Sequence, residues 1–525
     1  MNNQNKIKVN LYIILLTGAV LWTLNPAIGQ EIKKNNWQHL DPQRDSVMGI
    51  SSDRAYGEKL RGRTGVPVIV AVIDGGLDTA HRDFQGLLWR NPGEIPGNGK
   101  DDDHNGYIDD VHGWNFLGSA KGSFQYDNLD LVRQLRTAVK ASNRKQASQF
   151  REELAQKRAS WRQIREASEK DLDVLRRMLD GISNPNPQEK DFRAYRYKNP
   201  AEQQLLLRIV AGFKQGLDFG TFRDALESRY RNAREQLDYW QNPDYDPRKD
   251  KAFRRPFYGN GDVQGPLSGH ATHVAGIIAA KGVSPEGGRG IAQNVRLMVL
   301  RTVPTGDYLD EELALAIRYA ADQGAKVINV SIGKSTALQP ELIDAAVQYA
   351  MDKDVLIVHA VGNLGKLLEQ GAYPKKNYQN GGQAKAWIEV GASGMKDDAN
   401  LLFRASNYGK AVVDVFAPGV GINSCVSGNG YAYLSGTSMA APVVSGMAAV
   451  LRSYYPYLSA SQIRQIILES VTKVNHPVKT SDGQMIPFSE TCASGGVVNL
   501  NNAVGSAEKM TVKKSSNNSN GMEKK

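Results

Sequence analysis

The sequence is poor in cysteine, with only Cys425 and Cys492 in 525 residues. This scarcity excludes a disulfide-stapled scaffold and zinc sites built from cysteine pairs. Neither cysteine has a histidine beside it in the sequence, so we expect neither a cysteine nucleophile nor a thiolate-bound metal. One disulfide between the two cysteines and two separate buried thiols remain as alternatives.

Long apolar runs are also scarce, and the clearest one lies at the N-terminus, where residues 11–24 follow Lys6 and Lys8. This run is shorter than the ~20 residues that a bilayer-spanning helix needs. A positive start, a short apolar centre and small residues up to Gly29 predict a secretory signal peptide over residues 1–29. We therefore expect an exported protein, periplasmic or extracellular, with no membrane span left after cleavage.

The chain lacks blocks of like charge as well. Its net charge is +10, but the basic residues are scattered among acidic ones. A scattered pattern is typical of a solvated surface, so we expect no nucleic-acid partner. With 41% hydrophobic and 23% charged residues, the balance is that of a globular protein able to bury a large core.

Apolar, β-branched runs alternate with helical patterns over much of the chain. Helical spacing occupies residues 311–323 and 340–352, and runs that suggest buried strands occupy residues 66–73, 295–300, 326–332, 355–361 and 386–390. This alternation predicts an α/β fold with a mostly parallel central sheet and right-handed crossovers.

Composition also divides the chain into parts. Residues 127–255 contain no strand-like run and predict an inserted helical subdomain, a small packed bundle that interrupts a main domain of residues 66–126 and 256–507. Residues 30–65 are too few to fold alone and should pack onto the main domain through side chains such as Trp37. The polar residues 508–525 predict a disordered tail.

Three side chains stand where catalytic groups are often placed. Asp74 follows a predicted strand, and His270 and Ser438 each open an apolar helix. His270 could take the proton of the Ser438 hydroxyl while Asp74 orients the imidazole. His273, one turn further on, should face the packing surface of its own helix and serve a structural role. Taken singly, Asp74 would more often be a turn residue and Ser438 a helix cap.

A fourth polar residue, Asn363, follows the predicted strand at residues 355–361. Its side-chain amide could donate to a developing oxyanion together with the backbone N–H of Ser438, which lies at the positive end of a helix. The simpler alternative is a turn asparagine.

These windows, in this order, closely resemble the subtilisin-like serine proteases, or subtilases. The resemblance is carried by residues 72–76, 270–276, 327–333, 362–363 and 436–442. It implies a three-layer α/β/α domain, a catalytic triad of Asp74, His270 and Ser438, and Asn363 as the oxyanion donor. It further implies that Ser331, Ile332 and Gly333 form an edge to which the substrate backbone adds as a β-strand.

The chain departs from the family pattern in three places. Ala271 stands where the family usually has glycine, the folded inhibitory prodomain is absent or replaced by residues 30–65, and residues 282–290 lack the usual asparagine-rich calcium loop. The route of maturation therefore does not follow from the resemblance.

Another segment has the pattern of a calcium loop. Asp101, Asp103, Asn105, Tyr107 and Asp110 place oxygen ligands at calcium-loop spacing, with Tyr107 contributing its backbone carbonyl. The closing glutamate of such loops is missing, and an acidic surface turn is the alternative. Any calcium here would be structural, since the expected chemistry needs no cofactor.

The sequence therefore predicts an exported serine endopeptidase that acts on protein or peptide substrates through an acyl-enzyme on Ser438. A non-catalytic scaffold on the same fold, with the insertion as its binding surface, is the alternative from another class. A sedolisin-type acid peptidase is disfavoured because that family has an aspartate where Asn363 stands.

Overall fold

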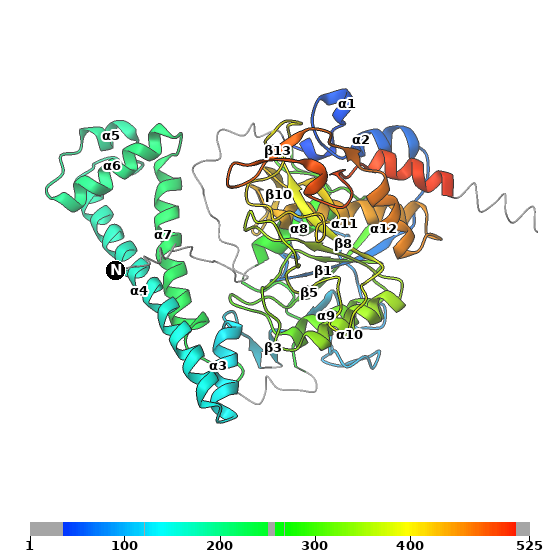
Figure 1. Ribbon diagram of the computed structural model, residues 1–525, viewed down its shortest axis with the longest axis horizontal. Coiled ribbons are helices and arrows are strands. Elements are labelled where there is room, and N and C mark those ends of the chain that lie inside the picture. Colours follow the sequence, from blue (N-terminus) through cyan, green and yellow to red (C-terminus); the bar gives the residue numbers. More distant parts are fainter. Residues whose placement is uncertain (1–34, 120, 250–257, 267, 511–525) are drawn as a thin grey trace, which may run out of the picture.

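The computed structural model describes residues 35–119, 121–249, 258–266 and 268–510, with elements labelled as in Figure 1. The predicted signal peptide lies outside these residues. The main sheet has the order β12-β15-β9-β8-β7-β6-β1-β5-β2. All neighbours are parallel except β12 and β15. The strands are β1 (Val68–Asp74), β2 (Gly113–Asn115), β5 (Val295–Arg301), β6 (Val327–Val330), β7 (Leu356–Ala360), β8 (Trp387–Ser393), β9 (Val415–Pro418), β12 (Thr472–Lys473) and β15 (Gly496–Val497).

Helices cover both faces of this sheet. One face packs against α8 (Ser268–Ala279), α11 (Thr437–Tyr454) and α12 (Ala460–Glu469), and the other against α9 (Asp310–Asp322) and α10 (Pro340–Asp352). Because strand residues point alternately to the two faces, neighbours such as Val72 and Ile73 belong to different core clusters. The predicted α/β class and mostly parallel sheet are confirmed.

The predicted strand over residues 326–332 is too long by two residues at its end, because β6 stops at Val330. Ser331 leaves the ladder and bonds to the start of α11 instead. Three short antiparallel hairpins were not predicted, since segments this brief carry little periodicity. They are β3 (Gly118–Ser119) with β4 (Gly122–Ser123), β10 (Ile422–Val426) with β11 (Gly430–Leu434), and β13 (Pro477–Lys479) with β14 (Met485–Pro487).

The insertion forms an arm beside the main domain (Figure 1). It contains α3 (Asp130–Lys140), α4 (Arg144–Asp180), α5 (Glu189–Ala194), α6 (Pro200–Lys214), α7 (Phe219–Glu235) and the π-helical turn η4 (Gln236–Trp240). A single compact bundle was the wrong expectation: α4 has 37 residues and is therefore about 55 Å long. Two separate small cores form along it, one around Leu175 and Phe192 and the other around Val132 and Leu154.

The segment before β1 packs on the main domain as far as it is described. It contains η1 (Trp37–His39), α1 (Pro42–Asp45), α2 (Ser52–Arg54) and η2 (Ala55–Lys59). Trp37 and Ile50 are buried in the same core as α8 and α11. At the other end, residues 500–510 are helical and Met510 packs on that core, so the tail predicted from residue 508 begins too early. Residues 511–525 lie outside the described structure.

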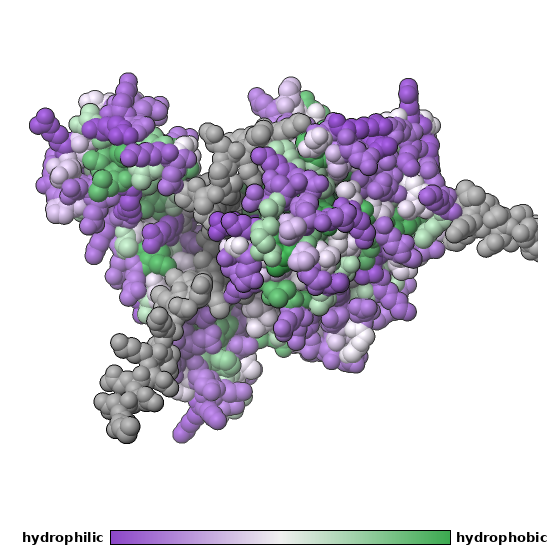
Figure 2. All heavy atoms as spheres, turned by 45° about the horizontal axis from the view of Figure 1, so that its top comes forward, coloured by the Kyte–Doolittle hydropathy of each residue, from purple (hydrophilic) through white to green (hydrophobic). Residues whose placement is uncertain are grey.

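Hydrophilic side chains dominate the face of the arm and main domain seen in Figure 2, with smaller hydrophobic patches between them. In the part of the chain that the structure describes, no helix combines the length and the apolar character that crossing a membrane would require.

Candidate active site

Asp74 and His270 form a hydrogen-bonded pair. Asp74 ends β1, and its carboxylate accepts from His270 Nδ1 at 2.8 Å and 3.0 Å and from the backbone N–H of Gly75 at 2.7 Å. Burial disfavours a charged His270, but the charge of Asp74 and its hydrogen bonds outweigh burial, so the pKa of His270 is raised. The pair orients the ring with Nδ1 bound, which leaves Nε2 as its working nitrogen.

Ser438 is the second residue of α11 and is tied to Ser331 twice. Ser438 Oγ donates to the Ser331 carbonyl at 3.1 Å, and Ser331 Oγ donates to the Ser438 carbonyl at 3.1 Å. The second bond is possible because Pro442 stands four residues further along the helix and has no N–H to offer that carbonyl. In the described structure, no hydrogen bond joins Ser438 to His270.

Asn363 lies three residues beyond β7 and is exposed. Its Oδ1 accepts from the backbone N–H of Thr437 at 2.9 Å, which fixes the amide against the start of α11 and leaves Nδ2 as the donor available to a ligand. The backbone N–H of Ser438, in the first turn of the helix, lacks an intrahelical acceptor. Two donors of the kind that stabilise an oxyanion, Asn363 Nδ2 and the backbone N–H of Ser438, thus lie at the start of α11.

Sheet register brings these groups to one edge. Ile73 and Val330 are partners across β1 and β6, so Asp74, the last residue of β1, lies next to Ser331, the first residue beyond β6. His270 is bonded to the first and Ser438 to the second. The order of parallel strands therefore gathers residues 74, 270 and 438 from distant parts of the chain.

A buried polar chain that the sequence analysis missed supports Ser331. Ser445 Oγ donates to Asn329 Oδ1 at 2.8 Å, and Asn329 Nδ2 donates to Ser331 Oγ at 2.9 Å. This chain links the middle of α11 to the end of β6, so it holds Ser331 and Ser438 in register. Asn329 interrupts an otherwise apolar strand, and that was the signal available in the sequence.

Buried side chains also support residues 331–333, the segment expected to bind substrate. Ser331 is buried and Ile332 and Gly333 are partly exposed. His359 donates Nε2–H to the Ile332 carbonyl at 2.8 Å, and its Nδ1 contacts Glu389 at 2.7 Å. These buried partners, also missed in the sequence, hold the segment in place while Ile332 and Gly333 stay partly exposed.

Two residues near His270 have structural roles. Burial lowers the pKa of His273 to about 3, and its Nε2 donates to the carbonyls of Ile422 and Ala432. The methyl group of Ala271, which stands where glycine was expected, is fully buried in the core against which α8 packs. Neither residue reaches the pair formed by Asp74 and His270 through a hydrogen bond in the described structure.

The predicted calcium loop gathers carboxylates. Oxygens of Asp101, Asp103 and Glu94, which was not predicted, lie within 4.8 Å of one another. Asn105 Nδ2 bridges Asp103 and Asp110, at 3.1 Å and 2.9 Å. No lysine, arginine or histidine forms an ion pair with these carboxylates among the described residues, so their negative charge is not neutralised by the protein.

Tyr107 contributes to this loop through packing. Its ring contacts Trp114 and Tyr319 edge-on, with centroids 5.2 Å and 4.9 Å away, and its backbone N–H donates to Asn105. Hard oxygen ligands without a protein counter-charge fit Ca²⁺.

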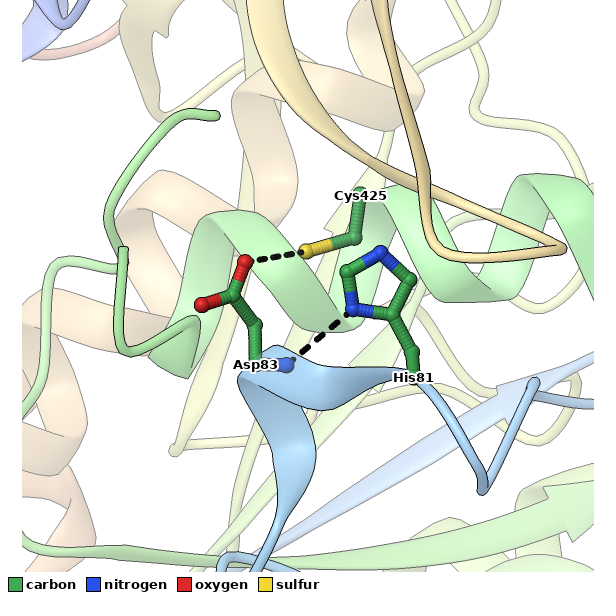
Figure 3. Close-up of side chains that lie close together, drawn as sticks. All are labelled: His81, Asp83 and Cys425. Atoms are coloured by element: carbon green, nitrogen blue, oxygen red, sulfur yellow. Dashed lines mark hydrogen bonds between the residues drawn. The ribbon is translucent and has the colours of Figure 1, made fainter. Parts of the chain in front are cut away.

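The cysteines are free and lie in different core clusters, so they are two buried thiols and not a disulfide. Although no histidine stands beside Cys425 in the sequence, the fold places this cysteine beside His81 and Asp83 (Figure 3). Cys425 Sγ donates to Asp83 at 3.6 Å, and Asp83 N donates to His81 Nδ1 at 3.2 Å. His81 Nε2 donates to the Gly430 carbonyl at 3.2 Å, so these groups already satisfy one another.

Comparisons with known proteins show the family to which the chain belongs. The model of the subtilase family matches residues 65–505, and the chain belongs to that family. It is 38% identical over 240 residues to the thermophilic serine proteinase of Bacillus sp. (strain AK1), an alignment that covers 46% of this chain and 55% of that protein. The chain thus spans about half the length of that relative.

Thermitase of Thermoactinomyces vulgaris is 38% identical over 209 residues, or 40% of this chain and 69% of thermitase. Among solved structures, Sphericase matches with a TM-score of 0.38 and 29% identity, covering 46% of this chain and 80% of Sphericase.

Proposed function

We propose that this subtilase is an exported serine endopeptidase that cleaves protein or peptide substrates through a triad of Asp74, His270 and Ser438. The observation that carries the proposal is the Asp74–His270 pair at the same sheet edge as Ser438 and its donors. The apolar run and small residues before position 30 support export.

The first chemical step forms an acyl-enzyme. Ser438 Oγ attacks the substrate carbonyl carbon and passes its proton to His270 Nε2. Asp74 stabilises the resulting imidazolium, and the Asn363 amide and Ser438 N–H bind the oxyanion. The carbon–nitrogen bond then breaks as His270 protonates the leaving amine. Water, deprotonated by His270, hydrolyses the ester and restores the serine hydroxyl.

Substrate binding would also move the Ser438 hydroxyl away from its resting position. Ser438 Oγ is held by the Ser331 carbonyl, an acceptor that an added substrate strand would need for its own backbone N–H. A substrate that bonds to Ser331, Ile332 and Gly333 would displace the hydroxyl and release it toward His270. Binding of the substrate strand would thus free the Ser438 hydroxyl to react.

The test is labelling with a fluorophosphonate, which reacts with activated serine hydroxyls. The wild-type protein should be labelled and Ser438→Ala should not, with circular dichroism showing that both are folded. If folded wild-type protein is not labelled, the scaffold alternative is favoured. Equal labelling of the two proteins would show that another serine reacts.

We also propose that residues 94–110 bind a structural Ca²⁺ ion. The support is the cluster of carboxylates from Glu94, Asp101 and Asp103, which carries no protein counter-charge among the described residues. Asn105 and Asp110 would complete the oxygen set together with the Tyr107 carbonyl. Glu94 comes from upstream and supplies the carboxylate that the loop lacks at its end.

A further inference from the structure

A groove of about 560 Å³ lies at the base of the arm, and the peptidase mechanism does not use it. It runs between α3 and α4, and Leu135, Val139 and Leu154 contribute apolar side chains to it. Leu135 and Leu154 are buried in the small core of the two helices, but Val139 is 49% exposed. Apolar surface is therefore open to a ligand here.

Cationic side chains line the same groove. Arg136 and Lys140 come from α3, and Arg151, Arg158 and Arg162 come from one face of α4. None of the described residues that line the groove is acidic.

The cations crowd one another. Burial and the charge of Arg162 lower the pKa of Arg158, whose guanidinium donates to the Leu237 and Gln241 carbonyls. Arg136 forms an ion pair with Asp246 at 4.0 Å and donates hydrogen bonds to Asn128 Oδ1 and to the Pro243 carbonyl. The groove therefore offers a positive field over an apolar floor.

A buried ion network fixes this groove to the active-site side of the main domain. On α3, Arg133 pairs with Asp127 at 3.0 Å and Asp130 at 2.7 Å. Lys334, which directly follows Gly333, pairs with Asp130 at 2.6 Å and Asp310 at 2.7 Å. The first residue of α3 thus contacts the residue that directly follows the expected substrate edge.

This contact sets the length of chain that could join the two places. At 1.5 Å per residue, Leu135 and Val139 lie about 8 and 14 Å along α3 from Asp130. An extended peptide advances about 3.3 Å per residue. A substrate bound along the edge would therefore reach the groove roughly three to five of its own residues beyond the one that lies next to Gly333.

We propose that the groove is a second binding site for substrate proteins, which takes an acidic segment bearing apolar side chains a few residues from the scissile bond. The inference rests on the proposed peptidase function. A peptide fits better than nucleic acid, because the described residues that line the groove include no aromatic side chain to stack with bases. It fits better than a membrane, because the apolar floor is recessed between two helices and not presented outward.

The experiment compares peptides that share one cleavable core. Either end carries an acidic tract with leucines after spacers of two, four or eight residues, and matched peptides carry neutral tracts. The ratio of kcat/KM for acidic over neutral peptides is measured for the wild type, for Arg151→Glu/Arg162→Glu, and for Arg176→Glu/Arg177→Glu. The last variant makes the same charge change on α4 outside the groove.

In the wild type, an acidic tract at one end should raise kcat/KM by about tenfold at low salt, and the gain should disappear at high salt. The groove variant should lose this gain and the control variant should keep it. Equal cleavage of acidic and neutral peptides by the wild type would overturn the proposal, as would equal loss in both variants. Failure to cleave any peptide would instead count against the peptidase function.

Binding can be measured without cleavage in the Ser438→Ala protein. Fluorescence anisotropy should show tighter binding of the acidic peptide than of the neutral one, and Arg151→Glu/Arg162→Glu should abolish the difference. Tighter binding to single-stranded DNA or to phosphatidylglycerol vesicles, lost in the same variant, would show that the groove serves another partner and contradict the proposal.

Discussion

Ser331 and Ser438 exchange two hydrogen bonds, each hydroxyl donating to the backbone carbonyl of the other at 3.1 Å. The exchange joins the end of β6 to the first turn of α11. It depends on Pro442, whose missing N–H leaves the Ser438 carbonyl without its helical partner. A proline within the helix thus creates the acceptor that ties the proposed nucleophile to the substrate edge.

Ser331→Ala should destabilise the fold, because the Ser438 carbonyl would lose its only hydroxyl donor in the described structure. We expect a loss of about 1–3 kcal/mol in the free energy of unfolding, measured by urea denaturation. Pro442→Ala supplies an N–H to the same carbonyl, so Ser331→Ala should cost less in that background. An equal cost in both backgrounds would contradict the role given to Pro442.

Asp74→Asn should lower the pKa of His270, because burial remains while the opposing charge is removed. In the wild type, activity requires neutral His270 and should rise with pH through a pKa above the ordinary value of about 6.5. The variant should lose about 10⁴ in kcat. Titration of His270 by NMR, in the Ser438→Ala background, would measure the shift. An unchanged His270 pKa would show that Asp74 does not set it.

Asn363→Ala should lower kcat by about 10²–10³, a figure that comes from a subtilisin, while KM changes little. The reason is that the amide would donate to the oxyanion in the transition state and not to the ground-state peptide. Steady-state kinetics with one short peptide would measure both constants. As a control, Asn502→Ala removes an exposed amide from the C-terminal helix and should leave both constants unchanged. A rise in KM alone would place Asn363 in ground-state binding.

Lys334→Met should destabilise the protein by about 3–5 kcal/mol, because it leaves Asp130 and Asp310 buried without their shared cation. Burial and the charge of Asp130 already raise the pKa of Asp307 to about 6, so negative charge is in excess there. Urea denaturation would measure the loss. Lys157→Met, at an exposed ion pair on α4, should cost less than about 1 kcal/mol.

Calcium should raise the melting temperature of the wild type, and a chelator should reverse the gain, because a ligand that binds only the folded state stabilises it. Asp101→Asn/Asp103→Asn should remove the response, and Glu94→Gln should weaken it. Differential scanning calorimetry with and without Ca²⁺ would measure these changes, with Mg²⁺ as the control ion. If Ca²⁺ does not change the wild-type melting temperature, the calcium proposal is contradicted and the loop is a hydrogen-bonded turn without an ion.

Local patterns in the sequence were enough to predict the α/β class, the main helices and the residues around Asp74, His270 and Ser438. Strand and helix periodicity depends on neighbouring residues, so a single chain displays it directly. The same patterns could not show that β6 ends at Val330, since that end is set by bonds to α11, more than a hundred positions away. The surroundings of Cys425 were missed for the same reason, because Asp83 lies 342 positions away from it. Glu94 was missed because it precedes the segment that has the spacing of a calcium loop.

By itself, the sequence determined which side chains could do chemistry, because each stands at a strand end or helix start that its own neighbours define. Only the tertiary structure determined which of these side chains lie next to one another. The order of parallel strands places Asp74 beside Ser331, and the position of α11 lets the Ser438 hydroxyl donate to the Ser331 carbonyl. A buried ion network holds the start of the arm against Lys334. Such relations depend on packing between distant segments, where burial and charge pairing, and not local conformational preference, set the geometry.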